Sequence, residues 1–330
     1  MMKYKAILNI VLLTLVLCLF PKQIFAQPAI DMDAVAGLTI VFRDGETVMR
    51  DASFDVYRIG DVHDDGNISL NETYAHYPIN LQPEDSQAWR GTATALKGYI
   101  LQDNLKPDFS GKIDAQGELN FNQLSCGVYF VVGDRYEYEG NAYESEPVFA
   151  ILPARDQAGD SWSYHLTVEP KTEIIPLPES PEEEYTMRKV LKVWEDDEAD
   201  DNRPKTVTVD LLRNGAVYDT VKLSEDCHWS HTWNRLEKKY SWTIVERPVE
   251  AYTVTVDREN KTFVLTNTFE ENSETKEPDP EPKPEPEHGN DEDTLPLTGQ
   301  PWIVCILLFA VGLLFVVVGL LCKRGEQDGC

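Results

Sequence analysis

Hydrophobic and polar residues alternate in short runs along most of the chain, and turn residues separate these runs. Residues 53–59 are one example, and the pair Asn214-Gly215 between two later runs is typical of a tight hairpin turn. Side chains alternate between the two faces of a strand, so a period of two predicts β-strands with one buried face. The runs fall into two groups, residues 34–172 and residues 187–269. We therefore predict an all-β protein with two tandem sandwich domains.

One segment departs from the period of two. Residues 85–102 carry apolar side chains three and four positions apart, which predicts a helix with Asp85 or Ser86 as its N-cap. Antiparallel strands joined in Greek-key order give an Ig-like architecture. We therefore expect an Ig-like Greek-key β-sandwich with one helical insertion at residues 34–172, and a smaller Ig-like sandwich at residues 187–269.

Each end of the chain carries an apolar run. Near the N-terminus two lysines precede such a run, and Ala26 follows a polar break, which predicts a secretory signal peptide at residues 1–26. Residues 302–322 are almost uncharged. As a transmembrane helix of about 1.5 Å per residue they would cross the ~30 Å hydrocarbon core of a bilayer. Basic residues open the tail at residues 323–330, which predicts that the tail is cytoplasmic.

Two segments rich in proline and glutamate connect these parts. Residues 173–186 are predicted to form a short, stiff linker between the two domains. In residues 270–294 proline alternates with mostly acidic residues, a composition that cannot bury a core. Such a segment favours extended polyproline II structure of about 3.1 Å per residue. We expect it to be a stalk that separates the domains from the C-terminal apolar run.

The composition excludes several classes of function. The 330 residues include 30 Lys and Arg and 57 Asp and Glu, a formal net charge of -27, whereas nucleic-acid binding requires a basic face. Only Cys126 and Cys227 of the six cysteines lie between the predicted terminal segments, so we expect no disulfide framework. The histidines lack metal-ligand spacing, and no catalytic triad or phosphate loop is found. We therefore expect no metal, no cofactor and no enzymatic turnover.

Residues 61–72 have the spacing of a calcium-binding loop. Asp61, Asp65 and Glu72 stand at its first, fifth and twelfth positions. However, His63 occupies a position at which calcium requires an oxygen ligand, and no helices are predicted on either side. We favour a hydrated loop, with calcium binding as the alternative.

A pentapeptide stands just before the C-terminal apolar run. It consists of Leu295, Pro296, Leu297, Thr298 and Gly299. A Leu-Pro-x-Thr-Gly sequence followed by an apolar span and a basic tail resembles the cell-wall sorting signal of Gram-positive surface proteins, which sortases recognise. The resemblance implies that a sortase cysteine attacks the carbonyl of Thr298 and that an amine then resolves the acyl-enzyme. The alternative is a single-span membrane protein with a chance pentapeptide.

The last predicted strand of the first domain ends at Val168, and Glu169, Pro170 and Lys171 follow it. With the strand and turn pattern before them, they resemble the N-terminal domains of Gram-positive sortase-assembled pilins. In pilins a Val-Tyr-Pro-Lys motif supplies the lysine that links one subunit to the next, and here Glu169 replaces the tyrosine. The resemblance implies that Lys171 is the acceptor amine. The alternative is a solvated lysine that leads into the linker.

The second domain carries motif residues in a recognisable order. They are Trp194, Arg203, Pro204, Asn214, Gly215, Trp229, Tyr240, Glu246, Leu265 and Asn267. This order resembles the collagen-adhesin B-type (Cna B) repeat of Gram-positive surface proteins. That family commonly forms an intramolecular isopeptide bond, which implies a crosslink between Lys192 and Asn267 with Glu246 as the catalytic residue.

The chemistry of such a bond sets conditions on these side chains. The Lys192 amine must be neutral to attack the Asn267 amide carbon, and burial among apolar groups lowers the pKa of a lysine. Glu246 must be protonated to polarise the amide and to move a proton, and the same burial raises its pKa. The alternative is an exposed Lys192 that pairs with Glu246, with Asn267 as a strand-end cap. The first domain lacks a lysine on its opening strand and an asparagine on its closing strand, so no such bond is predicted there.

These resemblances imply a peptidoglycan-anchored protein on the surface of a Gram-positive bacterium, most similar to an ancillary subunit at the base of a pilus. Its partners would be sortase, peptidoglycan and other pilin subunits joined through Lys171. The alternative function is a monomeric wall-anchored adhesin that binds a host matrix or cell-surface ligand.

Overall fold

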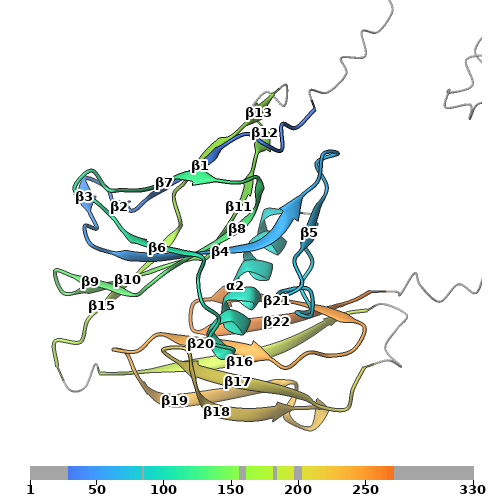
Figure 1. The fold of residues 1–330 in the computed structure, drawn as a ribbon. Coiled ribbons are helices and arrows are strands. Elements are labelled where there is room, and N and C mark those ends of the chain that lie inside the picture. Colours follow the sequence, from blue (N-terminus) through green and yellow to red (C-terminus); the bar gives the residue numbers. More distant parts are fainter. Residues whose placement is uncertain (1–28, 84, 156–160, 181–183, 197–202, 271–330) are drawn as a thin grey trace, which may run out of the picture. The chain divides into compact units, whose positions relative to one another are not determined.

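The structure is a computed structural model that describes residues 29–83, 85–155, 161–180, 184–196 and 203–270. Figure 1 shows its ribbon. β-Strands predominate in these residues, and α2 is the one α-helix among them. This mostly β, Ig-like organisation confirms the predicted fold class. The predicted signal peptide, stalk, sorting motif and apolar C-terminal run lie outside the described residues.

Within the described part of the chain, no helix is long and apolar enough to span a membrane.

The first group of strands runs from β1 to β15. Their bounds are Ala36–Val41 (β1), Arg43–Asp44 (β2), Thr47–Val48 (β3), Ser53–Val62 (β4), Ile68–Leu70 (β5), Phe109–Lys112 (β6), Glu118–Leu124 (β7), Gly127–Gly133 (β8), Tyr136–Tyr138 (β9), Asn141–Ser145 (β10), Val148–Leu152 (β11), Ala154–Arg155 (β12), Trp162–Ser163 (β13), His165–Val168 (β14) and Thr172–Pro176 (β15). The main sheets have the strand orders β14-β1-β7, β11-β8-β4-β5 and β15-β10-β9, and β6 also pairs with β4. Strand β8 is buried along its whole length, because sheet neighbours and packed side chains cover it.

Helix α2 (Ser86–Gln102) is the helical insertion that the apolar spacing predicts. The Asp85 side chain accepts hydrogen bonds from the backbone N–H groups of Gln87 and Ala88, so Asp85 is the N-cap. This cap satisfies two of the donors that a helix leaves free at its first turn.

The second group of strands forms a smaller sandwich. Their bounds are Tyr185–Glu195 (β16), Val207–Arg213 (β17), Ala216–Leu223 (β18), Ser230–Glu237 (β19), Trp242–Glu246 (β20), Tyr252–Glu259 (β21) and Thr262–Phe269 (β22). One sheet has the order β19-β16-β22-β21 and the other the order β18-β17-β20. Asn214 and Gly215 have φ angles of 50° and 85°, as the tight turn between β17 and β18 requires.

The segment between the sandwiches differs from the predicted linker. Its first residues belong to β15, which pairs antiparallel with β10 from Ser145 opposite Thr172 to Asn141 opposite Pro176. A proline at the end of such a strand leaves no ladder donor unpaired. Composition indicated a stiff connection, whereas backbone pairing makes its first part a strand of the first sandwich.

A hydrophobic core continues from the first sandwich through α2 into the second. It contains Phe130 of β8, Leu96 and Tyr99 of α2, and Ile244 and Val256 of the second sandwich. A separate core lies among β1, β4, β8 and β11 of the first sandwich. The helical insertion therefore packs on both sandwiches, and Figure 1 shows it in teal beside β20 and β21.

Candidate functional site

The structure brings together three of the predicted site residues from separate strands. Lys192 lies on β16, Asn267 on β22 and Glu246 on β20. Strands β16 and β22, the first and last of the second sandwich, are parallel neighbours, with Trp194 opposite Asn267. Glu246 belongs to the facing sheet. Lys192, Glu246 and Asn267 are 4%, 2% and 1% exposed, so Lys192 is not the exposed strand lysine of the alternative interpretation.

Short distances connect the three polar groups. Lys192 Nζ lies 3.8 Å from Glu246 Oε2, and Asn267 Nδ2 donates a hydrogen bond of 3.2 Å to Glu246 Oε1. The Lys192 amine also donates to the backbone carbonyl of Val193 at 2.9 Å. Glu246 thus lies within reach of both the amine and the amide that a crosslink would join.

Aromatic and aliphatic side chains surround the amine. Lys192 Nζ lies 4.2 Å from the centre of the Trp194 ring. Trp194 in turn meets Trp229 and Tyr252 edge to face, with ring centres 5.4 Å and 5.1 Å apart. Val190, two positions before the lysine on the same strand face, is fully buried. The alternation of β16 therefore places Lys192 inside the sandwich.

This burial shifts both titrating groups toward their neutral forms. Desolvation lowers the pKa of Lys192 to about 8, although the charges of Glu246 and Asp196 act in the opposite direction. Desolvation raises the pKa of Glu246 to about 7, against the opposing charge of Lys192 and the hydrogen bond from Asn267. A neutral amine and a protonated carboxyl are the forms that amide attack requires.

Two oxygen atoms of Glu246 and Asn267 are buried without a hydrogen-bond partner among the described residues. They are Glu246 Oε2 and Asn267 Oδ1. A protonated Glu246 would pair with the amide oxygen once the Asn267 amide rotates by half a turn. The amide carbonyl would then be polarised by a carboxyl proton, which is the arrangement that makes its carbon electrophilic.

Residues 188–268, which carry all three side chains, match the family described as the Cna protein B-type domain. This part of the chain is a Cna protein B-type domain. The match is to a structural domain and not to an enzyme, in agreement with the expected absence of turnover. The family match covers the second sandwich and leaves the first sandwich outside it.

Comparison with known proteins finds similarity to one adhesin sequence and to several solved structures. The collagen adhesin of Staphylococcus aureus is 33% identical over 72 residues, which are 20% of this chain and 6% of that protein. The match with the single B repeat unit of the S. aureus collagen-binding surface protein covers 72% of this chain and 98% of that unit, with 17% identity and a TM-score of 0.25. The match with the full-length major pilin SpaD of Corynebacterium diphtheriae covers 72% of this chain and 65% of the pilin, with 12% identity and a TM-score of 0.30. The chain thus matches only a small part of the adhesin.

The other predicted site residues lie elsewhere. Lys171 is exposed between β14 and β15, and its backbone carbonyl accepts a hydrogen bond of 2.7 Å from the backbone N–H of Glu146. It borders a cleft of about 930 Å³ between the first sandwich and the B-type domain. The five sorting-motif residues lie outside the described residues. Cys126 and Cys227 are both free.

The candidate calcium loop forms the turn of the β4–β5 hairpin. Asp61 forms an ion pair of 2.7 Å with Arg58, and Asp65 accepts a hydrogen bond from the backbone N–H of Asn67. Among the described residues, no group of three or more His, Cys, Asp or Glu side chains is placed to hold a metal ion. Asp61 and Asp65 are therefore each paired within the chain.

Tyr99 of α2 also reaches the site, and sequence reasoning missed it. Its hydroxyl donates a hydrogen bond of 2.8 Å to the backbone carbonyl of Glu246, although the two residues belong to different domains. The available signal was the glycine pair Gly91 and Gly98 within an otherwise ordinary helix pattern, since glycines seven apart leave room for another element on that face.

The pKa shifts predict how the rate of crosslink formation depends on pH. The reactive pair, neutral Lys192 with protonated Glu246, carries one proton in total. Below about pH 7 a second proton makes the lysine an ammonium, and above about pH 8 the glutamate is ionised. We expect a bell-shaped rate profile with its maximum between these pH values. To measure the rate, chain that has not yet reacted is refolded from urea at each pH, and the loss of ammonia is followed by intact mass. A rate that rises steadily to pH 10 would contradict the bell-shaped profile.

Proposed function

We propose that this protein is a cell-wall-anchored pilus subunit whose B-type domain is stabilised by an isopeptide bond between Lys192 and Asn267. The observation that carries the proposal is the burial of Lys192, Glu246 and Asn267 side by side in an aromatic pocket. Burying three polar groups together is costly unless they are paired or react. Once the Lys192 amine has become part of an amide it can no longer carry a charge, so Glu246 no longer has a buried charged neighbour.

The proposed reaction consumes no external reagent. The neutral Lys192 amine attacks the Asn267 amide carbon, while protonated Glu246 donates a hydrogen bond to the amide oxygen. Glu246 then transfers a proton from the attacking nitrogen to the leaving nitrogen. The new bond joins Lys192 Nζ to Asn267 Cγ, the bond from Cγ to Nδ2 breaks, and ammonia leaves. The carboxyl is regenerated, so the process is a single self-modification.

Processing at the two ends completes the proposal. Export would remove residues 1–26, and a sortase would cleave between Thr298 and Gly299 and pass Thr298 to peptidoglycan. Lys171 would receive the growing polymer, which would place the subunit at the base of the pilus. Its exposure supports this role, since a transpeptidase needs an accessible primary amine.

A second candidate function is a wall-anchored monomeric adhesin for a host matrix or cell-surface ligand. The observation that favours it is the 33% identity with a collagen adhesin over 72 residues. That identity covers only 6% of the adhesin, so it supports the domain type more strongly than the binding activity.

Intact-mass spectrometry of recombinant residues 27–294 tests the crosslink directly. The expected mass is that of the chain less one ammonia, and tryptic mapping is expected to find the Lys192 and Asn267 peptides joined. An unmodified mass in a folded chain would overturn the crosslink.

Replacing Lys171 with arginine distinguishes the pilus subunit from the adhesin. Arginine keeps the positive charge but has no primary amine, so we expect the high-molecular-weight ladder in wall extracts to lose this subunit. Monomer attached to the wall should remain. The matched control is Lys112→Arg, at another exposed lysine of the first sandwich. Ladders that contain the Lys171→Arg chain at wild-type abundance would favour the adhesin.

A further inference from the structure

Helix α2 of the first domain covers the open edge of the B-type sandwich. Strands β20 and β21 are the edge strands of their two sheets, and α2 packs against both. The contacting residues form one stripe on the helix, at successive spacings of four, seven and four positions, which places them on one face. They are Gln87 and Gly91, which meet β21, Gly98, which meets β20, and Gln102, which donates a hydrogen bond to Asp210 of β17.

Two glycines on this stripe allow a close approach. A Cβ atom at Gly98 would lie 2.8 Å from Val245 Cγ2 and 3.0 Å from the backbone oxygen of Ile244. A Cβ atom at Gly91 would lie 2.9 Å from Thr255 Cβ. All three distances are shorter than ordinary van der Waals contact. The helix therefore lies directly on the backbone of the strand that ends in Glu246.

Tyr99 ties the helix to this catalytic strand. Its ring is 3% exposed and stacks on Tyr77 with ring centres 4.9 Å apart, so its position is well determined by packing. Its hydroxyl donates the 2.8 Å hydrogen bond to the carbonyl of Glu246. In the described sheet β20 pairs with β17 alone, so this carbonyl gains its partner from the first domain.

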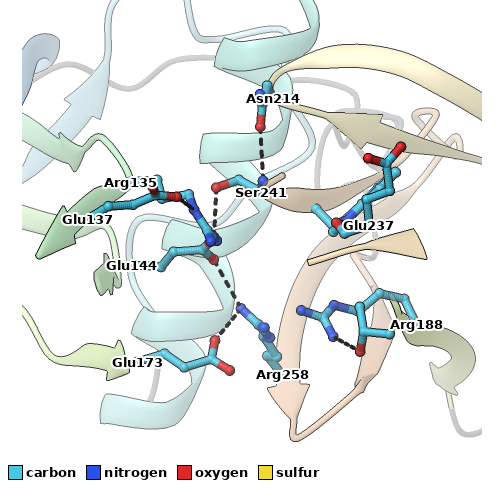
Figure 2. A network of polar contacts seen from close by, with 11 residues as sticks. Arg135, Glu137, Glu144, Glu173, Arg188, Asn214, Glu237, Ser241 and Arg258 are labelled. Atoms are coloured by element: carbon cyan, nitrogen blue, oxygen red, sulfur yellow. Dashed lines mark hydrogen bonds and ion pairs between the residues drawn. The ribbon is translucent and has the colours of Figure 1, made fainter. Parts of the chain in front are cut away.

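Polar contacts hold the two domains together beyond the helix. The backbone N–H of Val254 in β21 donates to the carbonyl of Pro78 at 2.8 Å. In the network of Figure 2, Glu144 of β10 accepts a hydrogen bond of 2.7 Å from Ser241. Arg258 of β21 forms an ion pair of 2.7 Å with Glu173 of β15. The docked arrangement thus has polar contacts in addition to those that α2 makes.

We infer that Tyr99 is a positioning residue for the crosslink, and that docking of α2 on the B-type domain is required for rapid isopeptide formation. This inference rests on the proposed crosslink. The reaction needs Glu246 within hydrogen-bond distance of both the amine and the amide, and displacements of about 1 Å suffice to slow such reactions strongly. The crosslink would therefore form only after the first domain has folded against the second.

The test compares Tyr99→Phe with Tyr129→Phe in the chain of residues 27–294. Tyr129 is a matched control, since it is 1% exposed and its hydroxyl donates a 2.9 Å hydrogen bond to the carbonyl of Ser125 within the first domain. Each chain is refolded from urea at pH 7.5, and ammonia loss is followed by intact mass. Tyr99→Phe is expected to slow the reaction about fivefold, the effect of one buried hydrogen bond. Tyr129→Phe should react at the wild-type rate.

A second pair of variants tests the docking itself. Gly98→Ala places a methyl group against the backbone of Ile244, whereas Gly111→Ala meets only the flexible side chain of Leu119 in the first domain. We expect Gly98→Ala to react at least tenfold more slowly and Gly111→Ala to react normally. Wild-type rates in Tyr99→Phe and Gly98→Ala would overturn the positioning role while leaving the crosslink intact. A wild-type chain that never loses ammonia would overturn both proposals.

Discussion

The Glu246→Gln variant is expected to fold and to keep the mass of the unmodified chain. Glutamine retains the volume of the buried side chain, but it cannot donate an acid proton or move one between the two nitrogens. Losing a positioned general acid–base group typically slows a reaction by about 10²–10⁴-fold. Desolvation, the largest influence on the pKa of Lys192, persists in this variant, whereas the opposing charge of Glu246 is removed. The amine should therefore be neutral in a larger fraction of molecules than in the wild type, and the loss of reaction would isolate the role of Glu246.

The matched control for this variant is Glu259→Gln, at an exposed glutamate at the end of β21 in the same domain. Intact mass reports the extent of reaction, and near-ultraviolet circular dichroism reports the fold. We expect Glu259→Gln to lose one ammonia as the wild type does. Ammonia loss from Glu246→Gln at the wild-type rate would remove Glu246 from the mechanism.

The second large effect is on thermal stability. A bond between Lys192 and Asn267 closes a loop of about 75 residues, and the loop-entropy relation used for disulfides gives about 4 kcal/mol of stabilisation for a loop of this size. In a domain of this size 1 kcal/mol corresponds to roughly 4–8 °C in Tm. We therefore expect the B-type domain of Glu246→Gln to melt about 20 °C below the wild type in differential scanning calorimetry.

Lys192→Met provides an independent route to the uncrosslinked domain. Methionine fills much of the lysine's volume, and Glu246 without its charged neighbour should be protonated, because desolvation dominates its pKa. Both variants lack the same bond, so both should show a similar fall in Tm, while Glu259→Gln should show little change. Equal melting temperatures for the wild type and Glu246→Gln would contradict a stabilising crosslink.

Much of the architecture follows from local patterns in the chain. The period of two predicts the strands, and the spacing of residues 85–102 predicts α2 together with its cap at Asp85. Strand alternation also predicts that Lys192 lies on the same face as Val190 and Trp194, since this depends only on the geometry of β16. The composition of residues 173–186 did not predict that most of β15 lies there, because backbone pairing with β10 depends on a distant partner.

By itself, the sequence determined which residue types are available for the crosslink and on which strands they lie. It could not decide what surrounds them. Only the tertiary structure places Glu246 of one sheet against Lys192 and Asn267 of the other, and only tertiary packing lays α2 on β20 so that Tyr99 meets the carbonyl of Glu246. The physical reason is that strand and helix periodicities are properties of neighbouring residues. Burial, pKa shifts and contacts between domains arise from segments far apart in the chain, such as Tyr99 and Glu246, which are 147 positions apart.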